Sequence, residues 1–258
     1  MTVRLLAAVG AAATLSLTVA ACDGRSTKQA PITTTTPGGA SAAPPAAQVE
    51  DRDNALVRVV HAVPAGASVD IYADDQRVFD GLDYKEVTAY REVPAERFSF
   101  AVRPAGAPQA PPLATNSEGL DDGRHYTVFA VPGDDSAATL RVVTDEQSLP
   151  AAGKARLRIV HAARDAGEID LVAAGVKDPL FDGVDFQNVS NYAEIDPVAG
   201  TVSVRPEGRT AALLTLRDVR FDAGKSYTVV VVGKVKGAPK LDAFVIEDAP
   251  AGPVSALR

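Results

Sequence analysis

An internal repeat of about one hundred residues constrains the fold of this chain more than any other feature. The segment Val57-Arg58-Val59-Val60-His61-Ala62 returns as Leu157-Arg158-Ile159-Val160-His161-Ala162. Four further motifs return in the same order at offsets of 100 to 102 residues: Val69-Asp70-Ile71 with Ile169-Asp170-Leu171, Phe79-Asp80-Gly81 with Phe181-Asp182-Gly183, Val102-Arg103-Pro104 with Val204-Arg205-Pro206, and Leu120–Tyr126 with Phe221–Tyr227. A unit of this length is domain-sized rather than a solenoid turn. The repeat therefore predicts two tandem domains, at residues 55–150 and 153–249.

Residues 1–21 are predicted to be a lipoprotein signal peptide. Arg4 supplies a basic start, and an uncharged apolar run follows it from residue 5 to residue 20. That run alone could be a membrane helix. However, Val19-Ala20-Ala21-Cys22 resembles the bacterial lipobox, in which small residues precede a lipidated cysteine. The alternative is an ordinary secretory peptide with an incidental cysteine.

Cys22 is the only cysteine in the sequence, which favours its use for lipid attachment. Acyl chains such as palmitate on Cys22 would hold an exported protein on the outer face of the bacterial cytoplasmic membrane, since two chains suffice for stable anchoring. With Cys22 used in this way, neither domain retains a thiol. This excludes a disulfide, a cysteine nucleophile and a thiolate metal site within the domains.

The remaining segments are a linker and a tail. Residues 22–54 are rich in Thr, Pro and Ala and lack apolar periodicity, so we expect a tether there, and residues 250–258 form a short tail. The sequence has 26 basic and 33 acidic residues; loss of Arg4 with the signal leaves 25 basic residues and a net charge of −8. Such a balance argues against nucleic acid as a partner and against electrostatic binding to anionic lipid.

The segments between turns are short and typical of strands. Phe98, Phe100 and Val102 alternate with more polar residues, which predicts one buried and one open face. Residues 157–161 alternate in the same way, with Arg158 and Val160 on the open face. Residues 227–232 are apolar on both sides, as in a central strand covered on both faces. With turn signals every 8 to 15 residues and no helical period, the sequence predicts seven or eight strands per copy, an all-β fold of two tandem immunoglobulin-like antiparallel β-sandwiches.

Both copies also carry the pattern of a tyrosine corner. In Leu120-x-x-Gly123-x-x-Tyr126 and its counterpart Phe221-x-x-Gly224-x-x-Tyr227, the tyrosine is expected to bond to backbone a few residues upstream. Antibody domains carry a cysteine two residues after this tyrosine, where Val128 and Val229 stand here. The pattern therefore favours a sandwich without the antibody disulfide.

At this point the chain resembles a known family. The succession Arg-Ile-Val-His-Ala, Ile-Asp-Leu, Phe-Asp-Gly, Val-Arg-Pro and Gly-Lys-Ser-Tyr-Thr-Val is similar to the bacterial DUF 4397 family (domain of unknown function), and it runs through residues 56–145 and 156–248. The resemblance implies exported, often lipid-anchored, sandwich-type proteins. It implies no activity and assigns no functional residues.

The repeated histidines are the sharpest candidates for a site. His61 and His161 each end a strand before an Ala, so each could be a ligand at the rim of a sandwich. The alternative is a histidine that caps the core and satisfies a loop carbonyl. A metal site usually needs three or four ligands, and the third histidine, His125, is not repeated. We therefore favour the structural role, and expect no metal and no cofactor.

Other repeated polar residues have structural explanations. Asp70 and Asp170 are expected to pair across strands with Arg58 and Arg158 on the open face. The repeated Arg103 and Arg205 could contact an anionic ligand, but a pair with a nearby carboxylate is the favoured interpretation. The repeated Asp80-Gly81 and Asp182-Gly183 are interpreted as tight turns rather than calcium loops. Gly224-Lys225-Ser226 is not a phosphate-binding loop, because Val219 stands where that motif needs a glycine.

No catalytic arrangement stands out in the sequence, so we do not expect an enzyme. The leading hypothesis is a lipid-anchored envelope protein acting as a non-enzymatic binding, adhesion or scaffolding module, with the membrane and an envelope protein or the cell wall as partners. One alternative is an envelope hydrolase or metal-dependent enzyme, in which His61 or His161 lines a pocket with two carboxylates. Another is a ligand-sensing accessory subunit of a membrane complex, with its site in the inter-domain groove.

Overall fold

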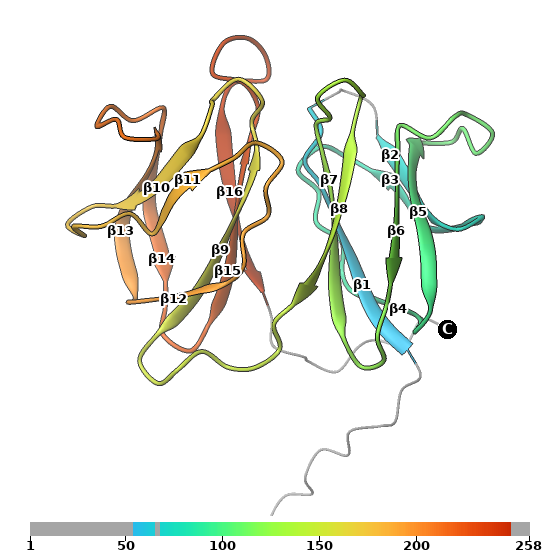
Figure 1. Cartoon of the computed structure of the whole chain (residues 1–258), viewed down its shortest axis with the longest axis horizontal. Helices are drawn as coiled ribbons and strands as arrows, with labels where there is room; N and C mark the ends of the chain where they lie inside the picture. Colours follow the sequence, from blue (N-terminus) through green and yellow to red (C-terminus); the bar gives the residue numbers. More distant parts are fainter. Residues whose placement is uncertain (1–53, 65–67, 249–258) are drawn as a thin grey trace, which may run out of the picture. The chain divides into compact units, whose positions relative to one another are not determined.

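The computed structural model describes residues 54–64 and 68–248, which form two β-sandwiches without a helix (Figure 1). The predicted signal peptide, Cys22, the linker up to residue 53 and the tail 250–258 lie outside the described residues. Within the described ranges, no helix is long and apolar enough to cross a membrane.

The first copy supplies eight strands and the second copy another eight, which agrees with the predicted seven or eight. The strands of the first copy are β1 (Asn54–His61), β2 (Val69–Ala73), β3 (Gln76–Leu82), β4 (Arg91–Pro94), β5 (Arg97–Pro104), β6 (Ala114–Gly119), β7 (His125–Val131) and β8 (Thr139–Asp145). Those of the second are β9 (Ala155–Ala162), β10 (Ile169–Ala173), β11 (Phe181–Val184), β12 (Ala193–Ile195), β13 (Val198–Pro206), β14 (Leu214–Phe221), β15 (Ser226–Val232) and β16 (Asp242–Asp248).

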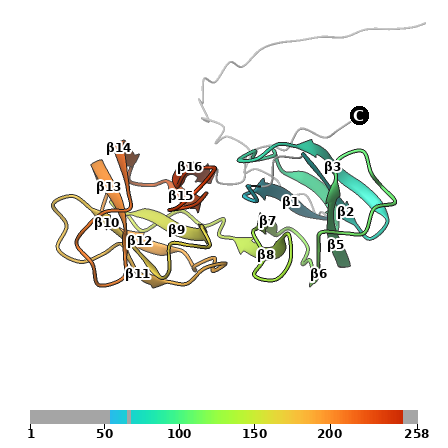
Figure 2. The ribbon, with the colours of Figure 1, turned by 90° about the horizontal axis from the view of Figure 1, so that it is seen from above.

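Each sandwich consists of two four-stranded sheets (Figure 2). The sheets of the first copy run in the order β4-β1-β7-β8 and β3-β2-β5-β6, and those of the second in the matching orders β12-β9-β15-β16 and β11-β10-β13-β14. Neighbouring strands are antiparallel except that β1 lies parallel to β7 and β9 parallel to β15. This order differs from that of antibody domains. The immunoglobulin-like character therefore lies in the two-sheet packing and in the tyrosine corner.

The core of each sandwich lies between its two sheets, as the period-two patterns predict. In the first copy, Val57, Ile71, Phe100 and Val128 come from four different strands and meet in one buried cluster. The second copy builds the same cluster from its own counterparts, among them Leu157. The prediction of two tandem sandwiches is confirmed.

The tyrosine corner is present in both copies. The phenolic oxygen of Tyr126 accepts a hydrogen bond from the backbone N–H of Asp121 at 2.8 Å, and that of Tyr227 accepts one from Asp222 at 3.1 Å. Both rings are buried. Each corner thus ties the start of a central strand to the loop before it.

The two Asp-Gly motifs are β-bulges, so their interpretation as tight turns was wrong. Gly81 lies inside β3, where Asp80 and Gly81 together oppose the single residue Asp70. Gly81 has a φ of 62°, which glycine adopts without strain. Its N–H donates to the Asp70 carboxylate at 2.9 Å, and the Gly183 N–H donates to Asp170 at the same distance.

The same contacts overturn the predicted pairing of Asp70 with Arg58. Asp70 lies in β2, which belongs to the sheet opposite that of β1. Its second carboxylate oxygen accepts from the N–H of Gly106 at 3.1 Å, and Arg77 lies 3.4 Å from that oxygen. The repeated aspartates therefore hold a bulge and a loop in place, and leave Arg58 to another partner.

Candidate functional site

The face predicted to be open on β1 and β9 is buried, and this is the largest departure from the sequence analysis. All eight residues of β9 are buried, including Arg158 and Val160. Both sandwiches belong to one compact unit, and a third apolar cluster draws on the facing sheets of both. Its buried members are Val60, Ala62, Phe129, Val131, Val160, Ala162, Val230, Val232 and Ile246. The face of β1 and β9 that points away from the core therefore packs against the other copy and is not exposed to solvent.

A polar network crosses this apolar interface. Arg58 Nε donates to Thr127 Oγ1 of its own sandwich at 2.8 Å, and its guanidinium pairs with the carboxylate of Asp248 in the other sandwich. Asp248 also accepts from the hydroxyls of Thr228 at 2.6 Å and Tyr192 at 2.9 Å. The Asp248 carboxylate therefore has partners from both copies.

The second half of the network mirrors the first. Arg158 Nε donates to Thr228 Oγ1 at 2.8 Å, and its guanidinium pairs with Asp145 of the first sandwich. Asp145 in turn accepts from Thr127 at 2.6 Å and from Tyr90 at 2.7 Å. Each arginine thus pairs with the aspartate of the other copy. We call the set the exchanged network: Arg58, Tyr90, Thr127, Asp145, Arg158, Tyr192, Thr228 and Asp248.

The protonation states in the exchanged network follow from these contacts. Burial alone would raise the pKa of Asp145, but the charges of Arg158 and Arg58 and the hydroxyl donors hold that pKa below its usual value. Burial and the nearby carboxylates raise the pKa of Tyr90 and of Tyr192, so both phenols stay neutral donors. The network is therefore two buried, charge-balanced pairs with neutral hydroxyl donors, in which loss of one partner would leave the other charge buried and unpaired.

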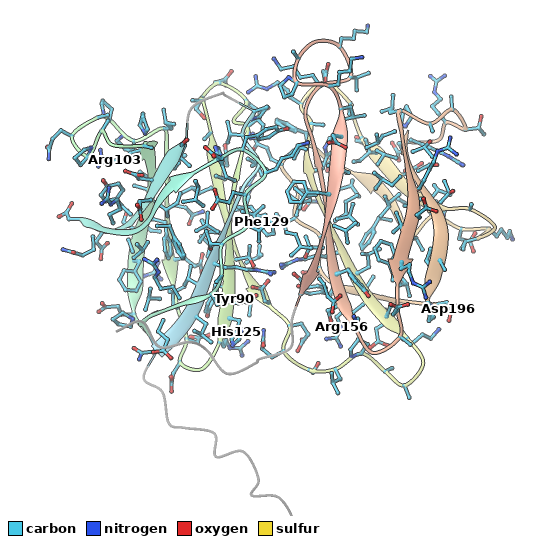
Figure 3. The ribbon with its side chains drawn as sticks, turned by 180° about the vertical axis from the view of Figure 1, so that it is seen from behind. Tyr90, Arg103, His125, Phe129, Arg156 and Asp196 are labelled. Carbon is cyan, nitrogen blue, oxygen red and sulfur yellow. The ribbon has the colours of Figure 1, made fainter. Side chains whose placement is uncertain are left out.

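Aromatic rings complete the enclosure of the arginines. The Arg58 guanidinium lies 4.8 Å from the centre of the Tyr90 ring, and that of Arg158 lies 4.5 Å from the centre of the Tyr192 ring. Figure 3 labels Tyr90 beside His125, whose ring centre is 4.9 Å from that of Tyr90. The repeated Tyr90 and Tyr192 are thus parts of the interface.

His161 caps the core and bonds to a loop carbonyl, as the favoured interpretation of the repeated histidines predicted. His161 is fully buried; its Nε2 donates to the carbonyl of Gly167 at 2.8 Å, and its Nδ1 accepts from the N–H of Ala163 at 3.3 Å. Burial lowers the pKa of His161, which keeps the ring neutral. His61 occupies the same place at the end of β1 and is buried too. In the part of the chain that is described, no group of three or more His, Cys, Asp or Glu side chains could hold a metal ion.

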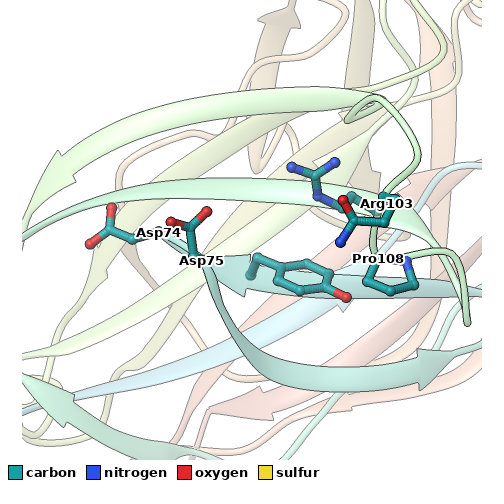
Figure 4. Close-up of a pocket in the computed structure, with 6 residues that line it drawn as sticks. Asp74, Asp75, Arg103 and Pro108 are labelled. Atoms are coloured by element: carbon teal, nitrogen blue, oxygen red, sulfur yellow. The ribbon is translucent and has the colours of Figure 1, made fainter.

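Arg103 does not pair with a carboxylate among the described residues, contrary to the prediction. Its guanidinium donates to the carbonyl of Ala110 and lies 5.5 Å from the centre of the Tyr72 ring. Around it is a pocket of about 470 Å³ lined by Tyr72, Asp74, Asp75, Arg103, Pro108 and Gln109 (Figure 4). We call this the Arg103 pocket. Its residues come from β2, the turn after it, β5 and the β5–β6 loop.

The Arg103 pocket is particular to the first copy. At the offset of 100, Val172, Ala174 and Gly175 stand where the first copy has Tyr72, Asp74 and Asp75. Only the arginine is shared, as Arg205. This pocket could have been found in the sequence by comparing the copies for positions at which a polar or aromatic residue of the first has no equivalent in the second. Repeated residues alone do not indicate it.

A second pocket is lined by residues of both copies. It has a volume of about 530 Å³, and its lining is Gly123, Arg124, Thr144, Asp145, Glu146, Gln147, Arg156, Asn191, Tyr192 and Glu194. Arg156 is largely buried there and donates to the carbonyl of Ser148 at 2.6 Å. Its charges are mixed, with Glu194 3.6 Å from Arg156. A further pocket of about 470 Å³ is also lined by both copies, by Asn116 and residues 141–143 of the first and by residues 185–189 of the second.

Comparison with protein families agrees with the fold. The profile of a family described as "Domain of unknown function (DUF4397)" matches residues 55–172 and 173–256. The chain belongs to the DUF4397 family. The two adjacent matches confirm the resemblance inferred from the motifs. Their border falls inside β10, whereas the sheets of the two DUF4397 sandwiches separate between β8 and β9. No match was found among curated proteins.

Proposed function

We propose that this DUF4397 protein is a lipid-anchored protein of the cell envelope, attached through Cys22, whose two sandwiches act together as a non-enzymatic binding, adhesion or scaffolding module. The observation that carries the proposal is the exchanged network. It explains the repeated polar residues Arg58 and Arg158 by the contact between the copies, and so leaves recognition to positions at which the copies differ.

The placement of the histidines supports a non-enzymatic role. The alternative of a hydrolase or metal enzyme requires His61 or His161 to line a pocket with two carboxylates. Both ring nitrogens of His161 are engaged with backbone groups, and both histidines are buried in the strand ends. Neither is among the lining residues of the Arg103 pocket or of the two pockets that both copies line.

The sensor alternative is supported by the two pockets that residues of both copies line, of which the pocket with Arg124 and Glu194 has the more varied charges. A ligand held there would contact residues of both sandwiches, such as Arg124 and Glu194. Small-molecule sites commonly occur at domain interfaces. This hypothesis differs from the first in its test, because it requires a small molecule rather than a macromolecular partner.

The proposal is tested by cell fractionation and by capture of partners. The full chain should sediment with membranes, and Cys22→Ala should release it. Purified protein with a C-terminal tag should capture a defined envelope protein or wall fragment from envelope extracts. Failure to capture any partner, together with turnover of a cell-wall substrate that His161→Ala abolishes, would overturn the proposal in favour of the enzyme.

A further inference from the structure

One edge of the sandwich differs between the two copies. In the first copy, β6 packs against β8 at one edge of the two sheets. Asn116 Nδ2 donates to the carbonyl of Leu140 at 3.0 Å, and the Leu140 side chain is only 2% exposed. Val142, two residues further along β8, packs against the same core. The space between β6 and β8 is therefore occupied by the sandwich's own side chains, and the pocket beside it, lined by Asn116 and residues 141–143, is bounded on its other side by residues 185–189 of the second copy.

The second copy lacks both parts of that closure. The strand registers place Leu216 where the first copy has Asn116, and Ala243 where it has Leu140. Leu216 has no side-chain donor to reach β16, and Ala243 is three carbons smaller than Leu140. As a result Val245, the counterpart of Val142, is 39% exposed although Val229 beside it is fully buried.

The outcome is an open groove between β14 and β16, which we call the β14–β16 groove. It has a volume of about 330 Å³ and is lined by Leu216, Arg217, Asp218, Val219, Arg220, Ala243 and Val245. The apolar side chains form its floor, and the exposed Arg217 and Arg220 stand at its rim with Asp218. Its lining therefore carries a net positive charge, on a protein whose net charge is negative. Arg220 also pairs with Asp222, 3.4 Å away, so Arg217 is the main contributor to this charge.

Strand β16 is a suitable template for another strand. It pairs in regular register with β15 from Asp242 to Asp248 on one side, and no described strand pairs with its other side. An edge strand of this kind presents a row of backbone donors and acceptors. Strand β14 is less suitable, because Arg217 and Asp218 form a bulge opposite Thr201. An added strand would thus pair with β16 and lay alternate side chains on the apolar floor.

We propose that the β14–β16 groove binds an extended segment of a partner protein that adds to β16 as a further strand. The segment would alternate apolar residues, which contact Leu216 and Val245, with acidic residues, which face Arg217 and Arg220. Main-chain hydrogen bonds provide affinity in this mode of recognition, and the side-chain pockets provide specificity. This inference rests on the proposed binding function and names the class of partner.

The test begins with a displayed library of ten-residue peptides selected on the full chain. The enriched sequences should alternate apolar and acidic residues. A synthetic enriched peptide should slow amide hydrogen exchange in β16. Ala243→Leu places in the groove the side chain that Leu140 has at the same position of the first copy. This variant should weaken binding of the peptide at least tenfold.

Charge variants provide a matched control. Arg217→Glu at the rim should weaken binding at least threefold, and Arg209→Glu on the exposed β13–β14 turn should not change it. Because Arg217 is exposed, this variant keeps the test informative if Ala243→Leu does not fold. Enriched peptides that bind both groove variants as tightly as the wild type would overturn the proposal.

Other occupants give different results. Binding seen only after removal of residues 250–258 would show that the chain's own tail fills the groove, and self-association lost in Ala243→Leu would show that a second copy does; either result overturns the proposal. Capture of the envelope partner that persists in both groove variants would refute the groove as its site and leave the proposed binding function intact.

Discussion

The exchanged network makes Asp145→Asn the most informative single substitution. The side chain of Asp145 is 2% exposed, pairs with Arg158 and lies 3.7 Å from the Arg58 guanidinium. Asparagine keeps the shape of the side chain but removes its charge, so Arg158 loses its carboxylate partner while still buried. Removing one member of a buried ion pair costs about 3–5 kcal/mol. We therefore expect the free energy of unfolding to fall by about that amount.

The assay is equilibrium unfolding in urea, followed by circular dichroism, on residues 23–258. Asp248→Asn is the matched variant, because Asp248 occupies the mirrored place opposite Arg58, and it should lose a similar amount. The double variant Asp145→Leu with Arg158→Met should recover most of the loss, since an apolar replacement of a whole buried pair is often neutral or stabilising.

A small effect would refute this reasoning. Exposed ion pairs contribute less than about 1 kcal/mol to the free energy of unfolding, and a loss of that size in both single variants would match such pairs. It would mean that water reaches the pairs and that the sandwiches are not joined through them. A large loss in the double variant equal to that of Asp145→Asn would show instead that packing around these side chains, rather than charge pairing, is responsible.

Three further predictions concern pH and the repeated residues. The lowered pKa of Asp145 means that its stabilising contribution is complete above its unfolded value of about 4 and is lost as the pH falls through its native value. Thermal unfolding from pH 7 to pH 2.5 should show this loss, and Asp145→Asn should flatten it. The lowered pKa of His161 likewise means that stability declines as the pH falls below about 6.5. His161→Gln should remove that decline, and an unchanged slope between pH 7 and pH 5 would contradict the buried neutral ring. Asp70→Ala leaves the N–H groups of Gly81 and Gly106 without their acceptor and should cost about 2–3 kcal/mol in urea unfolding. Asp75→Ala, an exposed neighbour, should change the same measurement little.

Much of the fold could be predicted from the sequence because the determinants are local. The alternation in β5 and the glycine and tyrosine of each corner depend on a few adjacent residues, and they predicted the sandwiches and their tyrosine corners. The burial of Arg158 could not be predicted in the same way. A polar residue on the face of a strand that points away from the core usually contacts water. Arg158 lies on that face of β9, but it is buried against the other copy, where Asp145 is its partner.

The candidate sites depended even less on local pattern. Arg103 was recognised as a repeated residue, but the pocket around it is made by Tyr72 and by loop residues that the second copy lacks. The β14–β16 groove follows from Ala243 standing where the first copy has Leu140. That correspondence lies outside the repeated motifs and becomes visible only when the strand registers are known.

The exchange of partners in the network has a consequence for single sandwiches. Each copy carries both an arginine, Arg58 or Arg158, and the aspartate that the other copy's arginine needs, Asp145 or Asp248. A surface of this kind is self-complementary, which is the property of the interface in a two-fold symmetric homodimer. The contact between the two sandwiches of this chain thus has the pattern of a two-fold symmetric dimer interface. A family member with one sandwich that has this arginine and this aspartate should therefore assemble into a symmetric pair through this sheet.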